Sequence, residues 1–267
     1  MSWFFVAALF AVAFGAYSLY NAHRAKGEVA DLLAVQASTT DVVAQMHAAA
    51  LAAAGPGAYR ERVELEGVVE VGPQGPLTSE VSGTTCVWHQ HKVTRHYEDV
   101  RRDKDGNRRT TKRTEKVVDN RTREPFVLRD AAGTITVVPV DGVKHAHKSA
   151  SEFRDRQSAD RGTDIRLGSF SMSLPSGNRG GGTLGHEYEE WVLTPGTSVF
   201  VSGEAVCRNG QLELRAPEGG RLLVSTRSEA ELLDKSRSDH RRNQLLGLGC
   251  LALGVVLAVV GLVDLLV

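Results

Sequence analysis

Cysteine is scarce in this chain, and its scarcity excludes two classes of small module. Three cysteines in 267 residues are too few for a disulfide framework or for a module built around several zinc ions. Net charge is also lacking, because 32 basic residues balance 32 acidic ones, so nothing global favours nucleic acid or acidic partners. Lysine is rare as well, and arginine carries most of the positive charge, a bias typical of a GC-rich bacterial genome.

Uncharged hydrophobic runs, by contrast, lie near both ends of the chain. The first covers Trp3 to Tyr20 and the second Leu245 to Val263, and each is about as long as a membrane helix must be. A cleaved signal peptide is the alternative for the first run, but it would begin with a positive segment that Met1-Ser2 does not supply. We therefore predict one transmembrane helix at each end.

Basic residues beside these runs predict how the chain is oriented. They follow the first run and precede the second, at His23, Arg24, Lys26, Lys235, Arg237, Arg241 and Arg242. The positive-inside rule therefore predicts that the middle of the chain lies in the cytoplasm and that both termini lie outside. Together with the composition and the two runs, this predicts a bacterial plasma-membrane protein that crosses the membrane twice. Gly254 and Ala258 form a small-xxx-small pair, which suits packing against the first helix, another copy of the chain or another membrane protein.

The pattern between the runs changes from helical to β. Residues 27–54 are predicted to be helical and end at Gly55-Pro56-Gly57. From Tyr59 onward apolar and polar residues alternate, as in half-buried strands. Val63 to Val71 and Val199 to Cys207 share one arrangement, each with a mid-strand glycine of the kind found where another backbone comes close. They are interpreted as two related β units of a small barrel, with chance similarity as the alternative.

The predicted fold class is therefore mainly β, with a small barrel-like or OB-like domain as its centre. The predicted parts are a transmembrane helix over 1–22, a helical juxtamembrane segment over 23–57, the β domain over 58–226, a charged helix over 227–244 and a second transmembrane helix over 245–267. Within the β domain, residues 149–163 and 176–185 are expected to form polar loops.

The stretch from Pro76 to His91 is the predicted centre of the β domain. Ser82-Gly83 favours a sharp turn into a strand. Side chains of a strand alternate between its faces, so Cys86 and Trp88 share one face, which we predict to be packed in the core. Cys86 would need a base within hydrogen-bond reach to act as a nucleophile. A buried structural thiol is the simpler interpretation.

Histidine and glutamate groups also have simple interpretations. His89 and His91 lie on the opposite face from Trp88, and residues 145 and 147 repeat the His-x-His spacing. No carboxylate or thiol is spaced to complete a metal site with them, so we expect surface histidines and no metal or other cofactor. The glutamates at 187, 189 and 190 suit an acid pair or a solvated strand face, and we expect the solvated face.

A strongly basic segment over 100–116 is predicted to form an exposed β-hairpin. Its candidate binding residues are Arg101, Arg102, Arg108, Arg109, Lys112 and Arg113. Next to a bilayer such a cluster would contact anionic lipid head groups; a solvated hairpin of mixed charge is the alternative. Nucleic acid is not expected as a partner, because no aromatic residues are interleaved for base stacking.

Several motifs follow one another along nearly the whole chain. They are Pro56-Gly57-x-Tyr59 with Val63-x-Leu65-x-Gly67, Pro76-Leu77-Thr78-Ser79 to Ser82-Gly83-Thr84-x-Cys86-Val87-Trp88, Pro125-Phe126-x-Leu128-x-Asp130-x-x-Gly133, and Glu187-x-x-Glu190 followed by Pro195-Gly196-x-x-Val199-x-Val201-x-Gly203. Together with the flanking helices they resemble the GIDE domain, also called the BAM ("beside a membrane") domain. That domain lies between two spans in membrane-embedded RING E3 ubiquitin ligases of the MULAN/MAPL type. The resemblance implies structural roles for Pro76, Ser82, Gly83, Cys86, Trp88, Pro125, Phe126, Asp130, Gly133, Glu187 and Gly203.

The sequence departs from that family in two respects. A RING after the second span would need about eight Cys or His ligands for two zinc ions, and the sequence to Val267 does not contain them. We therefore expect no RING and no ubiquitin transfer. The family's domain faces the mitochondrial intermembrane space, whereas the charges here favour the cytoplasm.

The sequence thus predicts a two-span membrane protein that presents a GIDE-type β domain beside the bilayer. Its expected role is binding or sensing of a lipid, a small ligand or a partner membrane protein. One alternative is E3 ubiquitin ligase family activity with the zinc module on a separate partner. A second alternative is a structural membrane organiser that acts through helix association.

Overall fold

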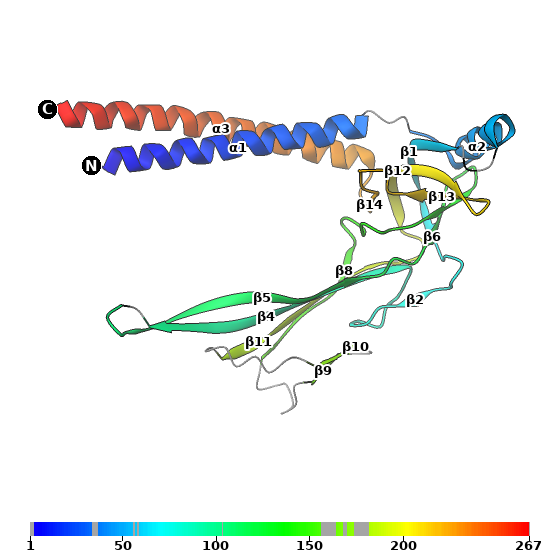
Figure 1. Cartoon of the computed structure of the whole chain (residues 1–267), viewed down its shortest axis with the longest axis horizontal. Coiled ribbons are helices and arrows are strands. Elements are labelled where there is room, and N and C mark those ends of the chain that lie inside the picture. Colours follow the sequence, from blue (N-terminus) through cyan, green and yellow to red (C-terminus); the bar gives the residue numbers. More distant parts are fainter. Residues whose placement is uncertain are drawn as a thin grey trace. The chain divides into compact units, whose positions relative to one another are not determined.

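A computed structural model describes residues 3–33, 37–55, 57, 59–102, 104–155, 164–167, 170–173 and 182–266 (Figure 1). The chain divides into two compact units. One is helical and joins the two ends of the chain, Met1–Gln36 and Arg227–Val267, whereas the other comprises Ala37–Thr226 and is mostly strands. The mainly β fold class with a helix at each end is thereby confirmed.

The helical unit pairs α1 (Trp3–Leu33) with α3 (Glu229–Leu266) in antiparallel fashion. Both helices, over Trp3–His23 and Glu229–Asp264, are long and apolar enough to cross a membrane. Each is longer than its hydrophobic run, because the helix continues through the charged residues beside it. The predicted juxtamembrane helix therefore begins as a continuation of α1.

Small residues line the contact between α1 and α3 at every seventh position. Ala8, Gly15 and Ala22 are buried on α1, and Gly247, Gly254 and Gly261 are buried on α3. A Cβ atom at Gly254 would lie 2.8 Å from a methyl carbon of Val12, too close for any side chain. The seam predicted for Gly254 is thus filled by the first helix of the same chain.

The β unit contains a closed five-stranded barrel. Its strands are β1 (Arg60–Glu70), β6 (Phe126–Arg129), β7 (Thr134–Val137), β13 (Gln211–Arg215) and β12 (Ser198–Arg208). They pair in that order, and β12 closes the barrel by pairing with β1, while β14 (Leu223–Ser225) adds to the edge of β12. All these pairs are antiparallel except β7 with β13. A five-stranded barrel of this order confirms the OB-like prediction.

The two similar stretches are neighbouring strands of this one barrel. Val63 pairs with Gly203 and Gly67 pairs with Val199 across the β1–β12 contact. A Cβ atom at Gly67 would lie 2.4 Å from a backbone oxygen of β6, and one at Gly203 would lie 2.8 Å from a backbone oxygen of β13. Both glycines therefore allow a close backbone approach, as the sequence predicts.

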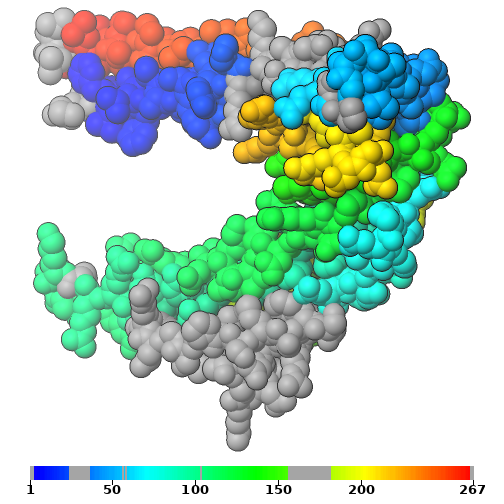
Figure 2. All heavy atoms as spheres, turned by 45° about the vertical axis from the view of Figure 1, so that its right-hand side comes forward, coloured from blue at the N-terminus to red at the C-terminus, as the bar shows by residue number. Residues whose placement is uncertain are grey.

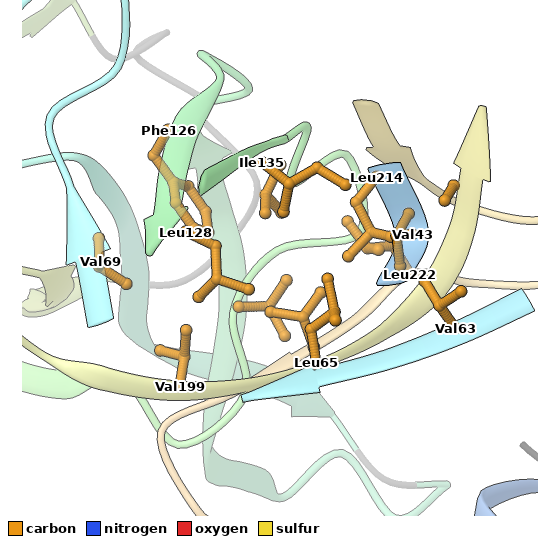
Figure 3. Packing of buried hydrophobic residues seen from close by; sticks show 14 of the residues in the cluster. Val43, Val63, Leu65, Val69, Phe126, Leu128, Ile135, Val199, Leu214 and Leu222 are labelled. Carbon is orange, nitrogen blue, oxygen red and sulfur yellow. The ribbon is translucent and has the colours of Figure 1, made fainter. Parts of the chain in front are cut away.

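Helix α2 (Thr40–Ala54) closes one side of the barrel core. Val43 is fully buried and lies among barrel residues that include Leu65, Leu128 and Leu214 (Figure 3). The helix start is fixed by Asp130, whose carboxylate accepts hydrogen bonds from the Thr40 amide at 2.7 Å and from its hydroxyl at 2.6 Å. This segment, predicted to be juxtamembrane, is therefore part of the β unit.

Two insertions into the barrel build a second, four-stranded sheet. One lies between β1 and β6 and supplies β4 (Trp88–Arg102) and β5 (Arg108–Arg121), and the other lies between β7 and β12 and supplies β8 (His147–Asp155) and β11 (Thr183–Leu193). The order in the sheet is β5-β4-β11-β8. Two small hairpins complete the unit: β2 (Leu77–Thr78) with β3 (Thr85–Cys86), and β9 (Asp164–Leu167) with β10 (Phe170–Ser173).

The loops expected over 149–163 and 176–185 are only partly tested. Residues 149–155 belong to β8 and residues 183–185 to β11, so the loop prediction is wrong there. Pairing with β11 makes β8 a strand despite its polar sequence, because an edge strand needs backbone partners on one side only. Residues 156–163 and 176–181 lie outside the described residues.

Candidate functional site

A two-stranded arm extends from the second sheet of the β unit. Strand β11 pairs with β4 only as far as Tyr97. Strands β4 and β5 continue beyond that point, and their last pair is Arg102 with Arg108. We call residues 98–112 the arm, and Figure 1 shows it extending beyond the end of β11. Gly106 in its turn has a φ of +81°, which favours glycine. A ribbon of two strands gains little stability by itself, so this extension serves something other than the core.

Like charges face each other across the arm. Arg101 pairs with Arg109 and Arg102 with Arg108, although like charges directly opposite each other destabilise a sheet. Asp99 compensates only part of this charge: its Oδ2 lies 3.0 Å from Nε of Arg101 and 3.1 Å from Nε of Arg113. Arg102, Arg108 and Arg109 have no carboxylate partner among the described residues. The four arginines predicted for binding therefore lie together at one exposed tip. Their positive charge exceeds the single negative charge of Asp99.

An open hollow of about 400 Å³ lies at the base of the arm, where β11 begins. Its lining residues are His96, Tyr97, Lys112, Arg113, Thr114 and Leu184. His96 is held there by Glu187, with 3.1 Å between Nε2 and Oε2, and the ring of Phe153 lies edge-on to it at 5.3 Å. The two other basic candidates, Lys112 and Arg113, thus lie at the base of the arm and not at its tip.

Glu190 is the best-bonded carboxylate of the second sheet. It is completely buried and accepts hydrogen bonds from the amides of Val81 and Ser82 and from the hydroxyls of Ser79, Ser82 and Ser149. Burial raises its pKa, but these hydrogen bonds more than compensate, so the pKa lies below its usual value. The expectation of a solvated face is therefore wrong for Glu190, because the loop over 79–84 folds across that face.

Two histidines of β4 are buried. His89 and His91 are 6% and 2% exposed, so the prediction of surface histidines is wrong for these two, whereas His145 and His147 are exposed. Nδ1 of His91 lies 3.5 Å from Oε2 of Glu80 in the loop. Burial lowers the pKa of His89, which favours the neutral ring. Within the described ranges no group of three or more His, Cys, Asp or Glu residues is arranged to hold a metal ion.

The central stretch is packed as predicted, although it is not one regular strand. The pairing is interrupted at Val87, and Cys86, Val87 and Trp88 are all buried. Burial, followed by the charge of Glu190, raises the pKa of the Cys86 thiol to about 11. A thiol with this pKa is almost entirely protonated at neutral pH and is a poor nucleophile.

The other motif residues also lie at structural contacts. Asp130 accepts hydrogen bonds from the amides of Ala132 and Gly133 in addition to those from Thr40, and a Cβ atom at Gly133 would lie 3.0 Å from the Thr40 hydroxyl. Phe126 is fully buried in the barrel core. Gly83 turns the loop with a φ of +68°. At these positions the motif residues therefore take part in packing, turns and hydrogen bonds to the backbone.

Comparison with known proteins gives one result. A family model described as "GIDE: E3 Ubiquitin ligase" matches residues 95–261. The match begins in β4, includes every later strand and ends within α3, so β1 precedes it. Neither the curated proteins nor the solved structures include a significant match.

Proposed function

This chain belongs to the GIDE family, described as E3 ubiquitin ligase, and from this premise we propose that it is a membrane-anchored binding protein whose arm contacts anionic lipid head groups. The single observation that carries the proposal is the pair of facing arginine pairs at the tip, Arg101 with Arg109 and Arg102 with Arg108. Mutual repulsion makes this arrangement unfavourable until an anion lies between or beside the guanidinium groups.

Phospholipid phosphates suit the chemistry of the tip. Each basic side chain near an anionic membrane surface contributes about 1 kcal/mol. The three arginines without a described carboxylate partner would together contribute about 3 kcal/mol, on the order of 100-fold in affinity. Because exposed charges are screened by salt, the contact should weaken as ionic strength rises. Nucleic acid is not proposed as a partner, since the arm lacks a row of aromatic residues for stacking.

A fluorescence experiment tests the contact. An environment-sensitive dye on Thr110→Cys, an exposed arm position, is compared in nanodiscs of neutral lipid and of lipid containing about one third phosphatidylglycerol. We expect a blue shift in the anionic discs at low salt that is reversed by about 0.5 M NaCl. Identical spectra in both discs would argue against lipid contact by the arm.

We further propose that the β unit lies in the cytoplasm of a bacterial cell, next to the plasma membrane. The support is the cluster of basic residues beside both candidate spans, which the positive-inside rule places in the cytoplasm. In intact cells an impermeant thiol reagent should fail to label Thr110→Cys, in a background where Cys207 is replaced by Ser, and should label it after lysis. Labelling of intact cells would place the unit outside.

Ubiquitin ligase activity is the second candidate, favoured by the family match itself. Transfer by RING ligases depends on a zinc module with about eight Cys or His ligands, and the described ranges contain no cluster of three or more candidate ligands. We propose that this chain contributes binding and that any zinc module is on a partner. A reconstituted assay of this chain should show no ubiquitin chains; robust chain formation would reverse the assignment.

A further inference from the structure

The arm presents two faces, and each carries one pair of arginines at the tip. Directly opposite residues of paired strands share a face, and the face changes from one residue to the next. Arg101 and Arg109 therefore lie on one face, and Arg102 and Arg108 lie on the other. Figure 2 shows the tip of the arm, in green, with side chains that spread to both sides.

The first face contains an anion of its own. Asp99 lies two residues before Arg101 and therefore on the same face. Its Oδ2 lies 3.0 Å from Nε of Arg101 and 3.1 Å from Nε of Arg113. A carboxylate of the chain itself thus binds two arginines of this face, which leaves less positive charge for an external anion.

The second face has no such anion beside its arginine pair. Neither Arg102 nor Arg108 has a carboxylate partner among the described residues. Glu98 shares this face, but it lies opposite Lys112 and four positions before Arg102. On the first face only Arg109 of the facing pair lacks such a partner. The second face therefore holds the pair in which both guanidinium groups are uncompensated.

Two guanidinium groups on opposite residues can bind one phosphate between them. Cβ atoms of directly opposite residues are about 5 Å apart, and each guanidinium can donate two parallel N–H bonds to phosphate oxygens. A phosphate monoester matches this pair best, because it carries a charge of about −1.5 to −2 at neutral pH and has three acceptor oxygens. A phosphate diester, as in phosphatidylglycerol, carries a single negative charge and has one acceptor oxygen fewer.

We infer that Arg102 and Arg108 clamp a phosphate monoester and thereby select it over phosphate diesters. The inference rests on the proposed function, because the clamp belongs to the same arm, and it adds the chemical class of the head group. The monoester is carried either by a lipid, as in phosphatidic acid, or by a soluble compound. One further charge-assisted hydrogen bond corresponds to about tenfold in affinity, so a preference of about tenfold is expected.

Native mass spectrometry of the full chain in a neutral detergent tests the inference. Equal amounts of phosphatidic acid and phosphatidylglycerol with the same acyl chains are added, and the ratio of the two bound lipids is measured. The wild type should retain about tenfold more phosphatidic acid. Arg102→Gln with Arg108→Gln should bring the ratio close to one. Arg101→Gln with Arg109→Gln removes the same charge from the other face and should keep the preference.

Three outcomes would overturn the inference. They are equal binding of the two lipids by the wild type, loss of the preference in both double variants, and a preference that persists without Arg102 and Arg108. Glycerol 3-phosphate then distinguishes the two sources of the monoester. Displacement of phosphatidic acid would show that the clamp takes a soluble monoester, and lack of displacement would show that it needs the lipid; either result agrees with the clamp.

The clamp and the lipid contact of the arm can fail separately. A blue shift in anionic nanodiscs together with equal binding of the two lipids would support the contact and overturn the clamp. Identical spectra in neutral and anionic discs, together with a preference for phosphatidic acid that depends on Arg102 and Arg108, would do the reverse.

Discussion

Ser82 binds Glu190 twice, through its amide nitrogen at 3.0 Å from Oε2 and through its hydroxyl to the same oxygen, across 108 residues of chain. This contact fastens the loop over 79–84 to the face of the second sheet. The loop in turn covers His91 and contributes Val81 to a small apolar cluster with Val93 and Tyr188. One buried carboxylate thereby joins the first insertion of the barrel to the second.

Replacing this carboxylate should destabilise the β unit strongly. Glu190→Gln keeps the shape but leaves donors of the loop facing an NH2 group, which should cost at least about 3 kcal/mol. The melting temperature should fall by roughly 6–12 °C. Glu187→Gln is the control, because Glu187 is partly exposed with His96 as its partner, and its effect should stay below about 1 kcal/mol. Similar shifts for the two variants in a thermal melt would contradict the role given to Glu190.

Trp88 should behave as a core residue. Trp88→Ala removes a fully buried indole and should cost about 3–5 kcal/mol, as large-to-small core changes do. Trp191, which is only partly buried against the same core, is the control, and Trp191→Ala should cost clearly less. An unchanged melting temperature for Trp88→Ala would mean that the indole belongs to a binding surface and not to the core.

Acid should weaken the β unit through His89. The pKa of His89 is lowered in the folded chain mainly by burial, so the unfolded chain takes up a proton more readily as the pH falls below about 6.5. The stability contributed by the neutral ring is present above that pH and is lost below it. Between pH 7.5 and pH 5.5 the melting temperature should fall less for His89→Gln than for the wild type. The exposed His147 is the control, and equal effects of His147→Gln and His89→Gln would rule out this origin.

The helix pair should depend on Gly254 and not on Gly249. A leucine at position 254 would clash with Val12 and with the backbone oxygen of Ala8, whereas a Cβ atom at position 249 meets nothing within 4 Å. Gly254→Leu should therefore separate α1 from α3 and reduce cross-linking between cysteines placed at Ala22 and His240, which lie in contact across the helix pair. Gly249→Leu should leave the contact between α1 and α3 and the cross-link intact. If both substitutions act alike, the close contact between these helices is not the one described.

Sequence alone predicts the parts of this fold that depend on local pattern. Alternation identifies β1 and β12, uncharged runs identify the two long helices, and the mid-strand Gly67 and Gly203 predict close backbone contacts. Closure of the barrel is different, because it depends on the parallel pairing of β7 with β13. The starting residues of these strands, Thr134 and Gln211, are 77 positions apart in the sequence, and no local pattern predicts that the two strands pair.

Burial of His89, His91 and Glu190 could not be predicted from alternation. Strand β4 is covered on both faces where it leaves the barrel, by the core around Trp88 and by the loop over 79–84. Alternation distinguishes a buried face from an exposed one, so it fails for a strand that has no exposed face. The hydroxyl-rich stretch from Ser79 to Ser82 was the available signal for the burial of Glu190, because a buried carboxylate needs hydrogen-bond donors such as these.

The most direct test of the lipid-binding proposal compares two triple substitutions in the nanodisc assay with the dye on Thr110→Cys. Arg102, Arg108 and Arg109 are replaced with Gln in one variant, and the exposed Arg62, Arg208 and Arg221 of the barrel in the other, so both lose the same charge. We predict that the first variant loses the blue shift in anionic discs and that the second keeps it. Loss of the shift in both would indicate a response to total charge, and retention in the first would show that the arm tip does not bind anionic lipid.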